Sequence, residues 1–233
     1  MVDPQDWREL WEGVQPGFEE YFRSEAQDSF TRLSDQIVLE PQMHVLDFGC
    51  GFGYLARRIA DKVASVSLWD FALNIRHQAF ENVKGHERVR FLDLSDDSGL
   101  ELCSDSFDIV LVNSVIQYMT IEEFLRWLKR WYSMLRSGGV IIISDVIPQD
   151  SSAIWELMAS LHFHARNGHL WRAIHRSVRR LLRYQKTRRR VPLQRYAWST
   201  IEALATDAGM IATRVPTNLT YRQERMTALL RPF

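Results

Sequence analysis

The chain has 233 residues, 46% of them apolar, which is enough for one substantial core but too few for two ordinary enzyme domains with linkers. Its 29 basic and 29 acidic residues cancel to a formal net charge of zero, so the whole chain lacks the basic excess of a nucleic-acid-binding protein. Only Cys50 and Cys103 are present, without CxxC spacing, so neither a disulfide framework nor a zinc site is indicated.

The first fourteen residues, MVDPQDWRELWEGV, carry acids and tryptophans where a secretory signal has a basic end and an apolar block. Nowhere do about eighteen apolar residues run together, the length that a membrane-spanning helix needs. We therefore expect a soluble, cytoplasmic protein.

Residues 1–40 are predicted to be helical, since aromatic and aliphatic residues recur there at helical spacing on both sides of a break at Pro16-Gly17. We expect these helices to close as a lid over a ligand, with Tyr21 or Phe22 on the inner face. The alternative is that they only cover a sheet.

From His44 onwards, short apolar runs alternate with longer amphipathic ones. The expected strands are residues 44–48, 65–70, 88–94, 107–114 and 140–146, and the expected helices are 54–63, 71–80 and 121–135, the last ending at Ser137-Gly138-Gly139. Strict alternation of strand and helix predicts a parallel sheet with helices on both faces.

After Pro148 the alternation stops. We expect a final helix from about Trp198 to Gly209, capped by Ser199 or Thr200, and then two strands at 211–218 and 224–232, the second able to pair antiparallel. The predicted organisation is an α/β, Rossmann-like, mostly parallel sheet of seven strands formed by residues 41–150 and 197–233. Residues 151–196 form a helical, arginine-rich cap inserted between the fifth strand and the last helix.

The stretch HVLDFGCGFGYLARRIA carries glycines 49, 51 and 53 between the first strand and the first following helix. Such a turn suits a ligand that approaches the main chain closely, with several backbone N–H groups pointing outward. A dinucleotide site would have its third glycine one residue later. Asp47 opposes a pyrophosphate but suits an ammonium or sulfonium cation, and Asp70, after the second strand, can accept hydrogen bonds from two ribose hydroxyls.

Four segments, VLDFGCGFGYLA, LWDFA, RFLDLSD and FDIVLVNSVIQYM, resemble in order and spacing the motifs of class I S-adenosylmethionine-dependent methyltransferases. The resemblance covers about residues 42–148 and, more loosely, the final helix and strand pair. It implies S-adenosylmethionine as the cofactor.

The resemblance also implies a role for each motif residue. Gly49, Gly51 and Gly53 would bring main chain against the methionine portion, Asp47 would lie nearby through water, and Asn113 would offer its carbonyl to the ammonium. Asp70 would hold the ribose, Phe71 would pack on the adenine, and Asp93 would accept from its exocyclic amine, a role that Asp96 or Asp97 could share. The predicted cofactor site is completed by Cys50, Leu94, Ser114 and Tyr21.

The residues after the fourth strand bear on the acceptor. Enzymes that methylate base amines commonly carry Asp/Asn-Pro-Pro-Tyr/Phe there, whereas this chain has Asn-Ser-Val-Ile-Gln-Tyr at 113–118, which is similar to small-molecule methyltransferases. We therefore expect metal-free transfer to a small molecule, free or linked to a carrier or lipid, most often at oxygen and next at nitrogen. The alternatives are N-methylation of a small molecule or peptide, a non-catalytic cofactor-binding protein and, less supported, a nucleotide-dependent oxidoreductase.

A proton acceptor is sought among residues beyond the strands and in the cap. The candidates are His162, His164, Tyr118 and Asp145, with His169 and His175 further away in sequence. Gln117, Tyr118 and His162 are the expected acceptor-binding residues, because ligands of open α/β sheets lie beyond the carboxyl ends of the strands.

The segment between Glu156 and Glu202 contains no acid and 11 of the 29 basic residues, which leaves 18 basic against 29 acidic residues, net −11, elsewhere. Residues 170–183 predict an amphipathic helix whose arginines, 172, 176, 179, 180 and 183, lie outside its apolar stripe. Three interpretations of this helix stay open: a cap helix with a solvated arginine face, a surface that binds an acidic carrier protein, and a surface that binds an anionic membrane. The net −11 elsewhere argues against sequence-specific nucleic-acid binding, and no feature indicates an oligomeric state.

Overall fold

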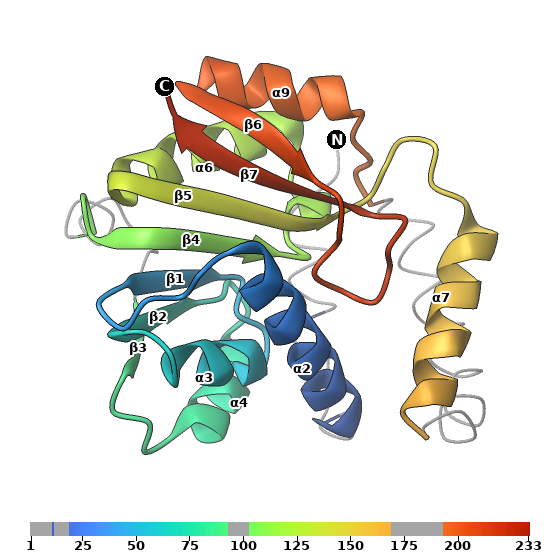
Figure 1. Cartoon of the computed structure of the whole chain (residues 1–233), viewed down its shortest axis with the longest axis horizontal. Coiled ribbons are helices and arrows are strands. Elements are labelled where there is room, and N and C mark those ends of the chain that lie inside the picture. Colours follow the sequence, from blue (N-terminus) through green and yellow to red (C-terminus); the bar gives the residue numbers. More distant parts are fainter. Residues whose placement is uncertain (1–10, 12–18, 93–102, 169–192) are drawn as a thin grey trace.

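Seven strands form one sheet in the order β3-β2-β1-β4-β5-β7-β6 in the computed structural model, which describes residues 11, 19–92, 103–168 and 193–233 (Figure 1). The strands are β1 (His44–Phe48), β2 (Ser65–Trp69), β3 (Val89–Phe91), β4 (Phe107–Asn113), β5 (Leu135–Val146), β6 (Met210–Val215) and β7 (Met226–Pro232). Strands β3, β2, β1, β4 and β5 are parallel, and β7 runs antiparallel to β5 and β6. The predicted Rossmann-like, mostly parallel sheet is confirmed.

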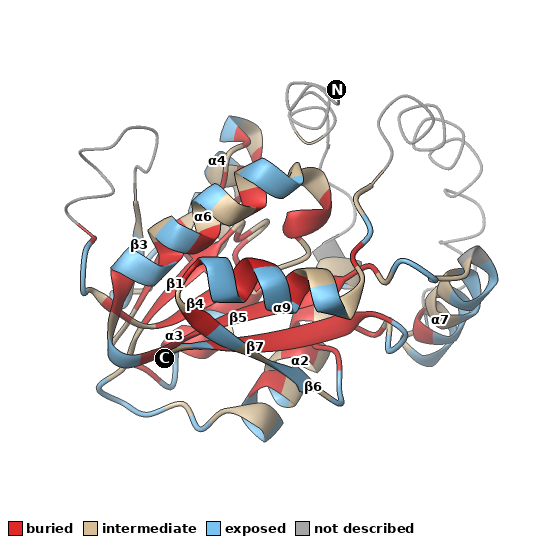
Figure 2. Ribbon diagram, turned by 90° about the horizontal axis from the view of Figure 1, so that it is seen from above, coloured by how far each residue is buried: buried red, intermediate tan, exposed pale blue. Residues whose placement is uncertain are grey.

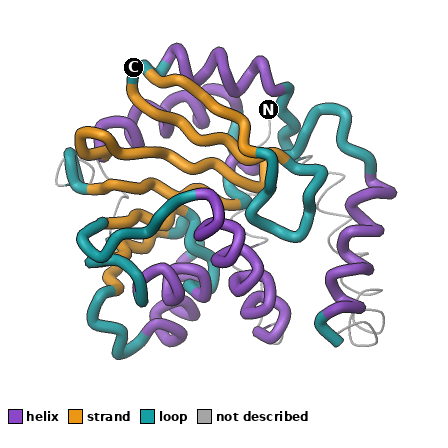
Figure 3. Tube along the Cα trace, viewed as in Figure 1, coloured by secondary structure: helices purple, strands orange, loops and turns teal. Residues whose placement is uncertain are grey.

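Helices cover both faces of this sheet (Figure 3). The described helices are α2 (Glu19–Gln36), α3 (Tyr54–Ala60), α4 (Leu73–Val83), the 3₁₀ turn η1 (Ile116–Tyr118), α6 (Ile121–Met134), α7 (Ala153–Arg166) and α9 (Trp198–Asp207). Buried residues of α2, α3 and α4 pack on one face, and those of α6 and α9 pack on the other. None of the helices in the described ranges is long and apolar enough to cross a membrane.

The period-two alternation of strand side chains explains the two cores. Along β4, Ile109 and Leu111 join the core under α2 and α3, whereas Val110 and Val112 join the core under α6 and α9. A parallel sheet covered on both faces buries both sets, and the central strands are accordingly almost wholly buried (Figure 2). The same alternation places Asp47 and Asn113 toward the side of the sheet that α2 and α3 cover.

One predicted helix end and one predicted helix cap are wrong. Helix α6 ends at Met134, and Leu135 already pairs with Phe107, so Gly138 and Gly139 lie within β5. A Cβ at Gly139 would come within 3.1 Å of the Phe107 carbonyl oxygen, which explains a glycine beside the irregular start of the β4–β5 pairing.

Helix α9 begins at Trp198 with Ala197 as its N-cap and without a side-chain cap, so neither Ser199 nor Thr200 caps it. The preceding residue explains this start, since the Tyr196 N–H donates to the Ile147 carbonyl at 2.9 Å and fixes the chain before the helix. By contrast, Thr120 and Glu123 form a full capping box at α6.

The described part of the inserted segment contains α7, which stands apart from the sheet (Figure 1). It exposes Ile154, Trp155 and Leu157, whereas Phe163 is buried. The predicted basic helix at 170–183 lies outside the described residues.

Candidate active site

One row of residues spans the carboxyl edge of the sheet. The last paired row across β2, β1, β4 and β5 is Trp69, Phe48, Val112 and Ile143. The next row is therefore Asp70, Gly49, Asn113 and Ser144. This is the edge where ligands of open α/β sheets bind, and the register alone brings three predicted cofactor residues onto it.

The turn from Gly49 to Gly53 has the close-approach geometry that its sequence predicts. All three glycines have left-handed φ values, 76°, 54° and 74°. A Cβ at Gly49 would lie 2.4 Å from Val115 Cγ2, whereas a Cβ at Gly51 would have no atom within 4 Å. The chain after β4 thus packs against Gly49, and open space remains over Gly51.

The expectation of several outward-pointing N–H groups in this turn is wrong. The N–H groups of Gly49 and Cys50 donate to the Trp69 carbonyl at 2.7 and 3.1 Å, and that of Gly53 donates to the Cys50 carbonyl at 3.0 Å. The Gly51 N–H donates to Asp70 Oδ2 at 3.0 Å. These hydrogen bonds fix the shape of the turn. The N–H groups of Gly49, Cys50, Gly51 and Gly53 are therefore already bonded within the protein.

Asp70 joins the glycine turn to the end of β2. Its Oδ1 accepts from the Ala72 N–H at 3.0 Å, its Oδ2 accepts from Gly51, and the residue is 6% exposed. These two backbone bonds orient the acid, and an ionised carboxylate is an acceptor that suits hydroxyl donors.

Asp47 lies two rows deeper in β1 and is 3% exposed. Burial, and then the nearby carboxylate of Asp70, raises its pKa to about 7. Two carboxylates that repel each other at a buried edge favour a cationic ligand, which would lower their mutual repulsion. The same burial raises the pKa of the Cys50 thiol, so this cysteine is not an activated nucleophile.

Two buried amide oxygens beside the row have no hydrogen-bond partner among the described residues. They are Asn113 Oδ1, at the end of β4, and Gln117 Oε1, in η1. The Gln117 amide nitrogen is fixed by the Ser114 carbonyl at 2.8 Å. Because buried polar atoms are rarely left unsatisfied, the two oxygens are candidates to accept hydrogen bonds from a ligand.

Asp145, at the end of β5, does not suit the predicted role of base. Its carboxylate accepts from Arg225 at 2.7 Å, Thr220 at 2.6 Å and Ser114 at 2.7 Å, and it is 1% exposed. Burial disfavours its charge, but Arg225 and Arg222 outweigh burial and hold its pKa below the ordinary value. The acid is a structural anion that fixes Ser114, whose φ is 61°.

Arg225 connects this anion to the inserted segment. Its guanidinium donates to Glu156 of α7 at 2.9 Å as well as to Asp145. Arg225 was not among the residues predicted from the sequence. The sequence feature that could have indicated it is its position directly before the apolar strand β7, because an arginine that is buried there needs anionic partners.

Aromatic contacts run from the glycine turn to α7 and form what we call the aromatic bridge. Phe52 of the turn lies 4.5 Å from Phe22, which lies 5.0 Å from Tyr21, and Tyr21 lies 5.5 Å from Phe163 and 5.4 Å from His164 (ring centroids). Burial, and then Glu25, raises the pKa of Tyr21 well above its ordinary value, so Tyr21 stays protonated. The bridge brings His164 to the inner side of α7 and leaves His162 exposed.

The remaining predicted residues are placed as follows. Tyr118 ends η1, with its ring 6.0 Å from that of Trp11, and Phe71 is half-buried directly after Asp70. Asp93, Leu94, His169 and His175 lie outside the described residues. The described ranges hold no group of three or more histidine, cysteine, aspartate or glutamate side chains arranged to bind a metal ion.

Comparison with known proteins identifies a family for the part of the chain that forms this edge of the sheet. Residues 45–139 match the model of the family described as "Methyltransferase domain". The chain is 22% identical over 136 residues to carboxy-S-adenosyl-L-methionine synthase of Aeromonas hydrophila, a match that covers 56% of this chain and 55% of the relative. It is 26% identical over 128 residues to phosphoethanolamine N-methyltransferase of Plasmodium falciparum, covering 54% and 48%. The chain thus spans about half the length of these curated relatives.

Among solved structures, magnesium protoporphyrin IX methyltransferase of Synechocystis with bound S-adenosylhomocysteine superposes with a TM-score of 0.55. It shares 16% identity, with coverage of 98% of this chain and 93% of the other, so it supports the fold. The glycine turn, Asp47 within β1, Asp70 directly after β2 and the matched family model agree. Residues 45–139 therefore form a methyltransferase domain, and the relatives and solved structures support a class I methyltransferase with S-adenosylmethionine as its cofactor.

Proposed function

We propose that the protein transfers the methyl group of S-adenosylmethionine to a small-molecule acceptor without a metal. The observation that carries the proposal is the row at the carboxyl edge, with the open glycine turn, two buried acids and the unpartnered Asn113 oxygen. The residues fit a cofactor that carries an ammonium, a sulfonium and a ribose. When bound, this cofactor supplies an electrophilic methyl group.

We assign the cofactor site by the chemistry of each residue. The open surface at Gly51 admits the ligand close to the main chain, Asp70 accepts from the ribose hydroxyls, and the Asn113 oxygen accepts from the ammonium. The buried charge at Asp47 stabilises the cationic portion. The remaining assignments follow the resemblance: Gly49, Cys50, Gly53, Phe71, Asp93, Leu94, Ser114 and Tyr21.

We propose His164 as the proton acceptor. It is half-buried beside Tyr21 on the inner side of α7, whereas His162 is exposed on the same helix and is a weaker candidate. An imidazole titrates near neutral pH, which suits a base that removes a hydroxyl or ammonium proton. Tyr21 keeps its proton and is therefore not the base, and Gln117 and Tyr118 orient the acceptor.

The acceptor is a small molecule, either free or carried by a protein or lipid. Oxygen is the first expectation, as the residues after β4 indicate, and nitrogen is the second, in line with the relative named phosphoethanolamine N-methyltransferase. The exposed apolar side chains of α7, Ile154, Trp155 and Leu157, suit contact with an apolar acceptor or its carrier.

Separate calorimetric titrations with S-adenosylmethionine and with NADH test the cofactor assignment. Binding heat with NADH and none with S-adenosylmethionine would reject it. Incubation of the protein with metabolite extracts and S-adenosylmethionine, followed by mass spectrometry, tests catalysis. A compound that gains one methyl group supports the enzyme. Binding of the cofactor without any methylated product across broad extracts would favour a non-catalytic binding protein.

A further inference from the structure

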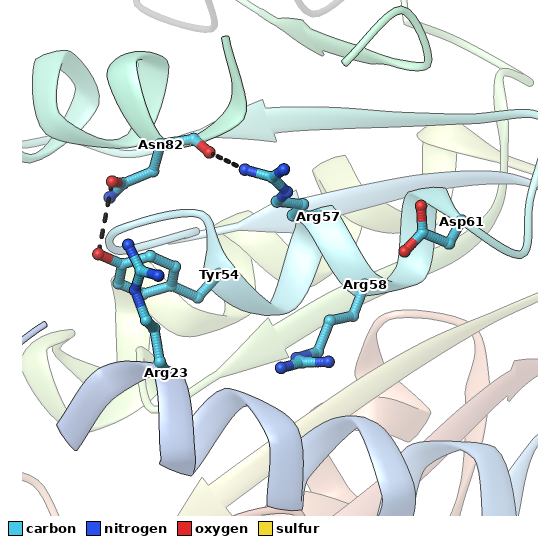
Figure 4. A pocket seen from close by; sticks show the side chains of 6 residues that line it. All are labelled: Arg23, Tyr54, Arg57, Arg58, Asp61 and Asn82. Atoms are coloured by element: carbon cyan, nitrogen blue, oxygen red, sulfur yellow. Dashed lines mark hydrogen bonds between the residues drawn. The ribbon is translucent and has the colours of Figure 1, made fainter. Parts of the chain in front are cut away.

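A cavity lies beside α3, between α2 and α4 (Figure 4). Its volume is about 270 Å³, and its lining residues are Arg23, Tyr54, Arg57, Arg58, Asp61 and Asn82. None of them belongs to the row at the carboxyl edge. The cavity is therefore distinct from the proposed cofactor site.

The charges around this cavity are unbalanced. The lining holds three guanidinium groups and one carboxylate, and among the described residues no carboxylate forms an ion pair with any of the three. The one acid, Asp61, is paired with His86 at 3.2 Å. With three guanidinium groups and one carboxylate, the lining carries a positive excess that an anion would balance.

The walls of the cavity are held in place by hydrogen bonds. The Arg57 guanidinium donates to the Asn82 carbonyl at 2.9 Å, and the Arg23 guanidinium lies over the Tyr54 ring, 5.0 Å from its centroid. The Asn82 amide donates to the Phe52 carbonyl at 3.0 Å and so joins α4 to the glycine turn. Arg58 has no hydrogen bond to a described residue, and its donors remain available.

We propose that this cavity binds a small, soluble phosphomonoester. The lining carries three positive charges and one negative, which matches a ligand of charge near −2. Several guanidinium groups can donate to the oxygens of one phosphate, which a carboxylate with two oxygens satisfies less fully. The volume is near the lower limit of small-ligand pockets, about 300 Å³, which leaves space for a short organic group and not for a nucleotide.

The test is calorimetric titration of the full chain, without S-adenosylmethionine, in a low-salt buffer free of phosphate. The ligands are inorganic phosphate, glycerol 3-phosphate and, as the uncharged control, glycerol. Because no cofactor or turnover is involved, the result is independent of the proposed methyltransferase activity.

The variants are Arg58→Gln and Arg23→Gln, which remove charge without removing the bond between Arg57 and Asn82. The matched control is Arg126→Gln, an exposed arginine of α6 on the opposite face of the sheet. We expect both phosphates, and not glycerol, to bind. Each cavity variant should weaken binding about threefold to tenfold, and the control should change it less than twofold.

Absence of binding to the wild type would overturn the proposal. So would affinity that is unchanged by Arg58→Gln with Arg23→Gln, since the phosphate would then bind the arginine-rich segment. Cosedimentation with phosphatidic acid vesicles that depends on Arg58, without binding of glycerol 3-phosphate, would assign the site to a lipid headgroup and also overturn it.

Discussion

Replacing Asp47 by asparagine should stabilise the cofactor-free protein, and the gain should depend on pH. The native pKa of about 7 lies above the ordinary value of 3.8, because the carboxyl is buried and faces Asp70. Between these two values the native state holds a proton that the unfolded state has released. Stability from this group is therefore present at low pH and is lost as pH rises from about 4 to 7.

The size of the effect follows from the two pKa values. Each pH unit between them costs about 1.36 kcal/mol, so the ionised carboxylate costs the folded state about 4 kcal/mol at pH 8. At pH 5 the same group costs less than about 2 kcal/mol. Asparagine keeps the shape of the protonated acid and carries no charge, so Asp47→Asn should recover most of each amount.

The assay is urea unfolding of the cofactor-free protein at pH 8 and pH 5, for wild type, Asp47→Asn and a control. Asp207→Asn, an exposed acid of α9, is a matched control that should change the free energy of unfolding by less than about 0.5 kcal/mol at either pH. A gain for Asp47→Asn that is equal at the two pH values, or a loss at pH 8, would refute the argument from burial.

Four further outcomes are expected. Asp70→Ala should weaken binding of S-adenosylmethionine roughly tenfold to a hundredfold in calorimetry, through loss of bonds to a charged acceptor, and an unchanged dissociation constant would contradict the ribose assignment. His164→Gln should lower kcat by roughly a hundredfold or more while His162→Gln has little effect, and equal effects would remove His164 as the base. A chelator should leave turnover unchanged, and activity that is abolished and then restored by magnesium would reverse this expectation. Charge reversal by Arg179→Glu with Arg183→Glu should reduce cosedimentation with anionic liposomes if the basic segment contacts a membrane, whereas absence of liposome binding by the wild type would leave the solvated cap or a carrier protein.

Local patterns were sufficient for most of the fold. The alternation of buried and turn-forming residues predicted all seven strands, because each is a contiguous run with its own signal, but β5 begins at Leu135 and not at Val140 as expected. The parallel register then brought Asp70, Gly49 and Asn113 together without any further information.

Contacts between distant residues could not be predicted in the same way. Asp145 was expected to be a base because it ends a strand at the ligand edge, and only the fold reveals Arg225, 80 residues later, at 2.7 Å. The two histidines of α7 were indistinguishable in sequence, since which one faces Tyr21 depends on how α7 docks. The cap of α9 was misplaced because a tertiary contact of Tyr196 decides where that helix starts.

The two ion pairs that Arg225 forms with Asp145 and Glu156 have a consequence for protein engineering. Exchange of residues 151–196 for the equivalent segment of another methyltransferase is an obvious route to altered acceptor choice. A graft without an acid at the position of Glu156 leaves the buried Arg225 with one anionic partner fewer, and a graft without an aromatic side chain at Phe163 removes the ring that stacks on Tyr221 at 4.4 Å. A chimera should therefore keep these two positions, or replace Arg225 and Tyr221 together with the segment.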